Sequence, residues 1–172
     1  MFYNSIMTSS RISTNIKKRD TPNDVFITPV ELAKTHINMI NSAPDDVWLD
    51  PFKNSGNYYN QFPTENKEYT EILEGKDFFD YDKNVDVICS NPPYSMIDKV
   101  LEHSVKLQPR VISYLIGVNN LTAKRMEYMT DNGYSITTLH ICKVYKWYGM
   151  SLLVVFEKGK PSIITYDRVV WK

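Results

Sequence analysis

The sequence has few cysteines and no long apolar run, and both features exclude whole classes of protein. Its two cysteines, Cys89 and Cys142, are too few for a disulfide framework and lack the close spacing of a zinc-binding pair. This usage indicates a reducing, cytoplasmic compartment. The best apolar stretches, residues 111–118 and 152–156, fall short of the roughly 18 residues that a membrane-spanning helix needs. We therefore expect neither a membrane span nor a cysteine-based metal site.

Glycine, proline and alanine are also scarce. Six glycines and nine prolines among 172 residues are too few for a low-complexity or fibrous chain, and this length predicts one domain. Alanine occurs only at positions 33, 43 and 123, whereas isoleucine, asparagine and tyrosine are frequent. This bias indicates an AT-rich genome, such as that of a phage or another virus.

Net charge is absent overall, because 20 basic residues balance 20 acidic ones, but its distribution is uneven. Residues 1–44 carry a net +2, residues 45–98 carry −8, and residues 99–172 carry +6. The start of the chain is basic and rich in serine and threonine, which predicts a flexible basic arm over residues 1–23. A basic C-terminal part could face phosphate and an acidic middle could hold a cation, although surface charge often only maintains solubility.

Strand and helix patterns alternate along the rest of the chain, which predicts one α/β domain over residues 24–172. The first helix is expected to begin with Thr28 as its N-cap, Pro29 at its first position and Glu31 completing a capping box. Such alternation, followed by a terminal antiparallel hairpin, predicts an open, doubly wound sheet. The expected helices cover 29–42, 97–107 and 121–130, and the expected strands cover 47–49, 68–73, 85–89, 111–118, 135–145 and 152–157.

A carboxylate and a turn of small residues follow the first predicted strand. Asp50 ends this strand, and Pro51, Phe52 and the small residues Ser55 and Gly56 come next. Ligands bind beyond the carboxyl ends of the strands in open α/β sheets, and small residues let a ligand approach the backbone. Taken alone, these residues could equally serve only to turn the chain.

Two further acidic residues have the spacing of a nucleotide site. Glu71 lies 21 residues beyond Asp50, close to the spacing at which an acidic residue binds ribose hydroxyls. Asp77 can accept a hydrogen bond from an exocyclic amine, and Phe78 can cover a purine face. The alternatives are a solvated glutamate and a loop aspartate followed by core phenylalanines.

The most specific motif is a loop with two consecutive prolines, Asn91-Pro92-Pro93-Tyr94, directly after the third predicted strand. The prolines fix two φ angles and remove two backbone donors, so the loop becomes a rigid row of acceptors. The Asn91 side-chain oxygen and the Pro92 carbonyl can each accept one N–H bond of an aromatic amine, which frees the nitrogen lone pair for attack. Tyr94 can stack on the base that bears the amine.

These motifs, in this order, resemble those of the S-adenosylmethionine-dependent adenine-N6 DNA methyltransferases with the cofactor motif on the N-terminal side. The resemblance spans about residues 24–157. It implies a seven-stranded, mostly parallel Rossmann-like sheet with an antiparallel C-terminal hairpin, and S-adenosyl-L-methionine as cofactor. The motifs that carry it are Phe26-Ile27-Thr28-Pro29, Asp50-Pro51-Phe52 with Ser55-Gly56, Glu71, Asp77-Phe78 and Asn91-Pro92-Pro93-Tyr94.

The resemblance also implies a role for each motif. Asn91, Pro92, Pro93 and Tyr94 would form the catalytic loop, and no metal is required. The acidic middle segment would face the sulfonium cation of the cofactor. The residues implied to bind the cofactor are Phe26, Thr28, Pro29, Asp50, Pro51, Phe52, Ser55, Gly56, Glu71, Asp77, Phe78 and Asn91.

The chain departs from the family pattern in two places that bear on its function. Asn54 stands where the family usually has a glycine, and asparagine tolerates positive φ. Only residues 159–172 follow the predicted hairpin, so we expect no separate target-recognition domain. Target recognition would then come from a partner subunit or from a second copy of the chain in a homodimer.

Several alternatives remain open at this point. The acceptor could be DNA, RNA or a protein glutamine, and the fold could instead serve as a catalytically degenerate nucleic-acid-binding or scaffolding subunit. Nucleic acid could be contacted by Lys143, Lys146, Trp147 and Tyr148, or these residues could cap the core. Lys124 and Arg125 could contact phosphate, or they could only face solvent. The three histidines, His36, His103 and His140, are isolated, and we expect them on the surface.

Overall fold

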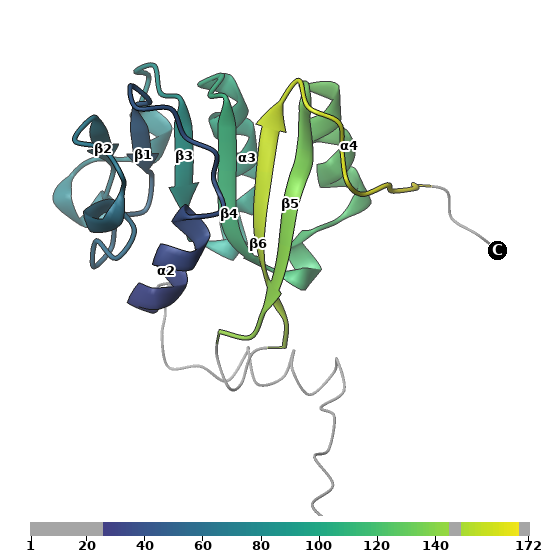
Figure 1. Cartoon of the computed structure of the whole chain (residues 1–172), viewed down its shortest axis with the longest axis horizontal. Coiled ribbons are helices and arrows are strands. Elements are labelled where there is room, and N and C mark those ends of the chain that lie inside the picture. The colour runs from purple at the N-terminus through teal and green to yellow at the C-terminus, as the bar shows by residue number, and fades with distance from the viewer. Residues whose placement is uncertain (1–25, 145–148, 169–172) are drawn as a thin grey trace, which may run out of the picture.

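A mixed six-stranded sheet forms the centre of the protein in the computed structural model, which describes residues 26–144 and 149–168 (Figure 1). The strand order is β2-β1-β3-β4-β6-β5; β1 to β4 are parallel, and β6 pairs antiparallel with both β4 and β5. The strands are β1 (Trp48–Asp50), β2 (Lys67–Tyr69), β3 (Val87–Ser90), β4 (Val111–Gly117), β5 (Tyr134–Cys142) and β6 (Ser151–Lys158).

Helices cover both faces of this sheet. Helix α2 lies in front of it in Figure 1, and α3 and α4 lie behind it. No helix in the described part of the chain is long and apolar enough to cross a membrane. The helices are α2 (Val30–Ile37), α3 (Ile97–Lys106) and α4 (Ala123–Asp131), and the 3-10 helices are η1 (Tyr59–Gln61), η2 (Ile72–Glu74), η3 (Phe78–Asp80), η4 (Tyr94–Met96) and η5 (Val118–Asn120).

The alternation of side chains along each strand divides the core into two clusters. Trp48, Val87 and Val111 pack with α2 on one face of the sheet. Their chain neighbours Leu49 and Ile88 point to the opposite face, where α3 and α4 pack. Apolar burial on both faces explains why the central parallel strands are continuous hydrophobic runs.

Strand β1 lies between β2 and β3, and this position determines where a ligand can bind. The chain leaves β1 towards β2 on one side and later returns to β3 on the other side. The two loops that follow β1 and β3 therefore lie at the point where the strand order reverses, which is the usual place of the ligand site in a doubly wound sheet. The loops concerned contain Asp50 and Asn91.

Most predicted elements are confirmed to within a few residues, including the antiparallel β5–β6 hairpin and helix α3. The described residues form six strands, which is the number that the sequence pattern predicts. The seven strands that the family resemblance implies are not found in them. The predicted basic arm over residues 1–23 lies outside the described residues.

The predicted start of the first helix is also corrected. Pro29 is the N-cap of α2, and no side chain caps the helix. Thr28 is only 5% exposed and precedes the N-cap Pro29, so the expected capping box with Glu31 does not form. The helix also ends earlier than expected, at Ile37, and a hydrogen-bonded turn continues to Ile40.

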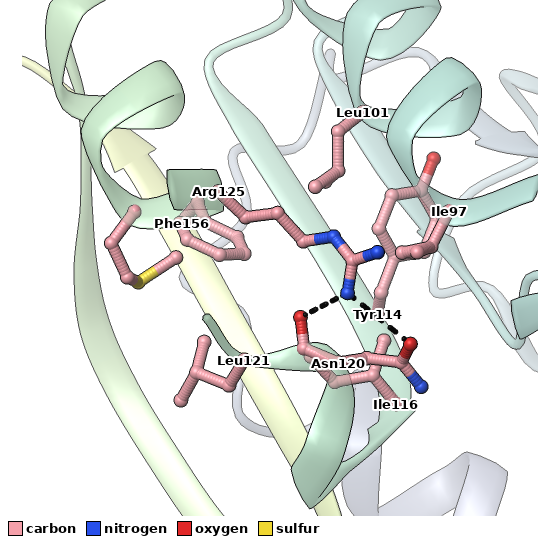
Figure 2. Close-up of a pocket in the computed structure, with 9 residues that line it drawn as sticks. Ile97, Leu101, Tyr114, Ile116, Asn120, Leu121, Arg125 and Phe156 are labelled. Carbon is pink, nitrogen blue, oxygen red and sulfur yellow. Dashed lines mark hydrogen bonds between the residues drawn. The ribbon is translucent and has the colours of Figure 1, made fainter. Parts of the chain in front are cut away.

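A small cavity lies between α3, β4 and α4, behind the sheet (Figure 2). Its volume of about 10 Å³ is close to that of a single water molecule. Arg125 reaches across it and donates to the backbone and side-chain oxygens of Asn120 at 2.9 and 3.3 Å. The cavity is too small for a substrate, and its lining contains none of the site residues predicted from the sequence.

Two leucines test the assignment of core and surface. Leu152 is 3% exposed in the cluster beneath α3 and α4, whereas Leu73 is 90% exposed. We expect Leu152→Ala to lower the free energy of unfolding by about 2–5 kcal/mol, because it removes buried methyl groups and leaves a cavity. Leu73→Ala should change it by no more than about 0.5 kcal/mol. Urea unfolding of both variants measures the difference, and equal losses would contradict the fold.

Candidate active site

Asp50 joins the ends of β1 and β3. It is fully buried, and its Oδ1 accepts a hydrogen bond from the Ser90 hydroxyl at 2.6 Å and from the Phe52 N–H at 3.3 Å. Its Oδ2 accepts from the Tyr59 N–H at 3.3 Å. Burial raises the pKa of Asp50 to about 6, although these hydrogen bonds act in the opposite direction. Asp50 therefore holds the two loops together and exposes no surface of its own to a ligand.

The turn after Asp50 has the backbone conformation that its sequence led us to expect. Asn54 adopts a φ of +45°, which confirms that asparagine supports the turn in place of glycine. Gly56 has a φ of +82°, and a Cβ built on it would lie 2.9 Å from the Asn60 Nδ2. The positive φ therefore favours glycine at this position, whereas the exposed Asn60 side chain could move away from a Cβ. Ser55 is exposed, and Pro51 is buried.

Glu71 lies beside this turn, as its spacing from Asp50 led us to expect. Its carboxylate accepts a hydrogen bond from the Asn54 N–H at 2.8 Å and from the Leu73 N–H at 3.1 Å. Glu71 is partly exposed, so its oxygens are also accessible to a ligand. The structure therefore brings a carboxylate next to the backbone of the Asp50 turn, where a ribose could be bound.

Asp77 and Phe78 follow, but only the aspartate is accessible. Asp77 accepts from the Phe79 N–H at 3.0 Å and is partly buried. Phe78 is 2% exposed, and its ring centroid lies 5.4 Å from that of Phe52 and 4.7 Å from that of His103. Phe78 is therefore a core residue, and the expectation that its ring covers a purine face is corrected. Phe52 and Phe79, by contrast, are partly exposed.

The segment before α2 crosses both loops. The Phe26 carbonyl accepts a hydrogen bond from the Asn91 Nδ2 at 3.1 Å, and the Thr28 carbonyl accepts one from the Asn57 Nδ2 at 2.7 Å. Phe26 is partly buried, Thr28 is buried and Pro29 is exposed. The structure thus brings Phe26 and Thr28 beside the two loops, whereas Pro29 is the N-cap of α2.

The double-proline loop follows β3 and leads through η4 into α3. Pro92 is buried, whereas Asn91, Pro93 and Tyr94 are partly exposed. Because the Asn91 amide nitrogen donates to the Phe26 carbonyl, the orientation of the amide is defined, and Oδ1 is the atom left to accept a hydrogen bond from a substrate. The arrangement can therefore receive an N–H donor next to the Asp50 turn.

Two of the three histidines are buried, which corrects the expectation that all three lie on the surface. His36 is fully buried between Tyr58 and Ser113, and burial lowers its pKa to about 3. His103 is 9% exposed and bonds the Tyr81 carbonyl. The position of His36 could have been found from its spacing, because it follows Ala33 and precedes Ile40 on the apolar face of α2.

The basic residues expected to contact nucleic acid differ in availability. Lys124 and Lys143 are exposed. Arg125 is committed to the protein, because its Nε donates to Asp98 at 2.6 Å and its Nη1 donates to Asn120. Lys146, Trp147 and Tyr148 lie outside the described residues. Within the described ranges, no group of three histidine, cysteine, aspartate or glutamate side chains is arranged to hold a metal ion.

The fold is that of known methyltransferases, although no family model and no curated protein matches the sequence significantly. The N-methyltransferase NodS from Bradyrhizobium japonicum, solved with S-adenosyl-L-homocysteine, has a TM-score of 0.60 at 9% identity, over 87% of this chain and 100% of that chain. A methyltransferase from Pyrococcus furiosus has a TM-score of 0.58 at 18% identity, over 88% and 98% of the two chains. Magnesium protoporphyrin IX methyltransferase from Synechocystis PCC 6803, solved with bound S-adenosylmethionine, has a TM-score of 0.56 at 11% identity, over 75% and 77%. At such identities the similarity establishes the fold alone.

The buried carboxyl group of Asp50 should give the protein a specific pH dependence. Because its pKa is about 6 in the folded state and 3.8 as a free side chain, the folded protein holds a proton between these values that the unfolded chain has released. This contribution to stability is present at pH 4 and is lost as the pH rises through 6. The stability of the wild type relative to Asp50→Asn should therefore fall by roughly 2–3 kcal/mol between pH 4 and pH 7.

Urea unfolding at a series of pH values measures this difference. The titration of His36 changes the stability of both proteins equally, so it does not affect the comparison. Ser90→Ala provides a second comparison, because the Ser90 hydrogen bond lowers the pKa of Asp50. Its loss should move the transition to higher pH. A difference between wild type and Asp50→Asn that stays constant with pH would show that Asp50 is not buried as described.

Proposed function

We propose that the protein is an S-adenosylmethionine-dependent methyltransferase that methylates an exocyclic amine of a nucleic-acid base, namely adenine N6 in DNA. The observation that carries this proposal is the Asn91-Pro92-Pro93-Tyr94 loop at the end of β3, tied through Ser90 and Asp50 to the turn after β1. The two loops meet at the switch point of a sheet that has the methyltransferase fold.

The residues around the turn fit S-adenosylmethionine. Asn54 and Gly56 hold the backbone in the positive-φ conformation that lets a ligand approach closely. The Glu71 carboxylate lies within hydrogen-bonding distance of the Asn54 N–H and can accept from ribose hydroxyls. Asp77 can accept from the adenine amine, and the carboxylates together favour a sulfonium cation nearby. Two of the similar structures were solved with S-adenosylmethionine or S-adenosylhomocysteine.

The double-proline loop provides the groups that would activate the acceptor amine. S-adenosylmethionine, when bound, supplies an electrophilic methyl group. The Asn91 Oδ1 and the Pro92 carbonyl each accept one N–H of the amine, so the nitrogen lone pair is directed away from the ring and towards the methyl group. Tyr94 stacks on the base and holds it in place after extrusion from the helix. Positioning and hydrogen bonding supply the acceleration, and no covalent enzyme intermediate is needed.

DNA is the acceptor that we favour, with RNA and a protein glutamine as alternatives within the same chemistry. The C-terminal part of the chain carries a net +6 over residues 99–172, and Lys124 and Lys143 are exposed and available to phosphate. Recognition of a specific site would come from a partner subunit or from a second copy of the chain. A digest of product nucleosides after reaction with labelled cofactor distinguishes the acceptors.

A catalytically degenerate, nucleic-acid-binding or scaffolding subunit is the other candidate, and Asn54 in place of glycine is one feature that favours it. The structure removes much of this support, because Asn54 adopts positive φ and its N–H is bound by Glu71. Salt-dependent DNA binding without any binding of S-adenosylmethionine would identify such a subunit.

Asn91→Ala tests the catalytic loop. We expect turnover to be abolished, because the acceptor amine loses the side-chain oxygen that orients it, while the dissociation constant for S-adenosylmethionine stays within about threefold of the wild type. Asn84→Ala is the matched control: Asn84 is exposed and precedes β3, at the opposite end of the same strand. The readouts are methyl transfer to unmethylated DNA and calorimetric titration of the cofactor. Full turnover in Asn91→Ala would remove the loop from the mechanism.

Glu71→Gln tests the cofactor site. The substitution removes a charged acceptor beside the Asn54 turn, and we expect it to raise the dissociation constant for S-adenosylmethionine about tenfold. Glu74→Gln is the control, because Glu74 lies on the same short turn but binds Lys53 and the Tyr69 hydroxyl at the surface. Calorimetry with S-adenosylmethionine and S-adenosylhomocysteine compares the two variants. Equal affinities in all proteins would exclude Glu71 from the cofactor site.

A further inference from the structure

A buried chain of hydrogen bonds runs from the loop after β1 to the centre of the sheet. We define this polar chain as Tyr58, His36, Ser113 and the Val154 carbonyl. The His36 Nδ1 lies 2.8 Å from the Tyr58 hydroxyl, and its Nε2 lies 2.7 Å from the Ser113 Oγ. Ser113 donates to the Val154 carbonyl at 3.2 Å. The side chains are at most 4% exposed, so water does not compete for these bonds.

The direction of every bond in the polar chain follows from its last acceptor. A carbonyl can only accept, so the single proton of the Ser113 hydroxyl is used by Val154. Ser113 must then accept from the His36 Nε2–H, which leaves Nδ1 without a proton in the neutral ring. Tyr58 consequently donates to Nδ1. One tautomer of His36 therefore satisfies both ring nitrogens and the groups that they contact.

The polar chain ends beside a residue that contacts the backbone orienting Asn91. Tyr58 follows Asn57, whose Nδ2 donates to the Thr28 carbonyl at 2.7 Å. Thr28 is two residues from Phe26, whose carbonyl accepts from the Asn91 Nδ2. The segment has no regular secondary structure before α2 begins at Val30, so side-chain contacts must fix its position. Asn57 and Tyr58 lie in the loop that starts at Asp50, so these contacts also join the segment to the turn after β1.

We propose that His36 is a positioning residue for Asn91: it holds Tyr58 in one hydrogen-bond arrangement, and through the neighbouring Asn57 this fixes residues 26–29 and presents the Asn91 Oδ1 to the acceptor. The catalytic consequence rests on the proposed function, whereas the structural link does not. His36 touches neither acceptor nor cofactor in this scheme. It acts through the segment that it anchors, because α2 itself has no side-chain N-cap.

The tautomer of His36 is the first test, and it needs no substitution. Long-range proton–nitrogen NMR spectra of the wild type report which ring nitrogen carries the proton. We expect His36 to show a protonated Nε2 and an unprotonated Nδ1, with no change between pH 8 and pH 5, because burial lowers its pKa to about 3. A protonated Nδ1, or a titration in this pH range, would overturn the proposed direction of the polar chain.

Tyr58→Phe tests the link to Asn91, with Tyr134→Phe as its matched control. Both substitutions remove one buried phenol hydrogen bond; that of Tyr134 reaches the Pro109 carbonyl at 2.7 Å and is not part of the polar chain. We expect Tyr58→Phe to move the side-chain amide NMR signals of Asn91 and to lower kcat about five- to tenfold, with the KM for the acceptor within about twofold. Tyr134→Phe should leave the Asn91 signals and kcat unchanged, although both variants lose stability.

The outcomes separate the inference from the proposed function. If both variants lose stability and neither moves the Asn91 signals or kcat, the polar chain is only structural and the inference is wrong. If Tyr58→Phe alone moves the Asn91 signals but the wild type transfers no methyl group to any acceptor, the positioning role is supported and the proposed function fails. If Tyr58→Phe moves the signals and lowers kcat without a matching change in KM, both are supported.

Discussion

The hydrogen bond between the Ser90 hydroxyl and the Asp50 carboxylate is the interaction on which the site depends. It joins the last residues of β1 and β3 in the buried centre of the sheet, at a donor–acceptor distance of 2.6 Å. Because Asn91 follows Ser90 directly and the glycine-containing turn follows Asp50, a shift of either strand end would move both loops. A buried carboxylate without such a partner is costly, so this bond and the loop N–H groups that also bind Asp50 constrain the backbone strongly.

A second constraint acts from the N-terminal side. The segment around Phe26 and Thr28 is distant in sequence from Asn91 but contacts it through a backbone carbonyl. His36 connects the following helix to β4 through Ser113, so the position of that segment is coupled to the middle of the sheet. The site is therefore assembled from loops that the two faces of the sheet hold from different directions, and it contains few residues that could relax independently.

The sequence indicated the elements and their order well where one physical effect dominated. The apolar run at β4, the helical spacing of α3 and the hairpin of β5 and β6 were all read correctly, because burial imposes the period of each element. The first helix was less predictable. Thr28 has the chemistry of an N-cap, but it is buried and precedes the N-cap Pro29, and local propensity does not report such tertiary burial.

The sequence by itself determined the chemistry of the site: a carboxylate before a turn, an asparagine that tolerates positive φ, and a double-proline loop that can only accept. These properties depend only on residue types and on short spacings, so they can be inferred without knowledge of the fold. Only the tertiary structure decided which groups face a ligand. It committed Asp50 to Ser90, placed Phe78 in the core and buried His36 between Tyr58 and Ser113. Burial and hydrogen-bond partners depend on segments far apart in the chain, and no local pattern contains that information.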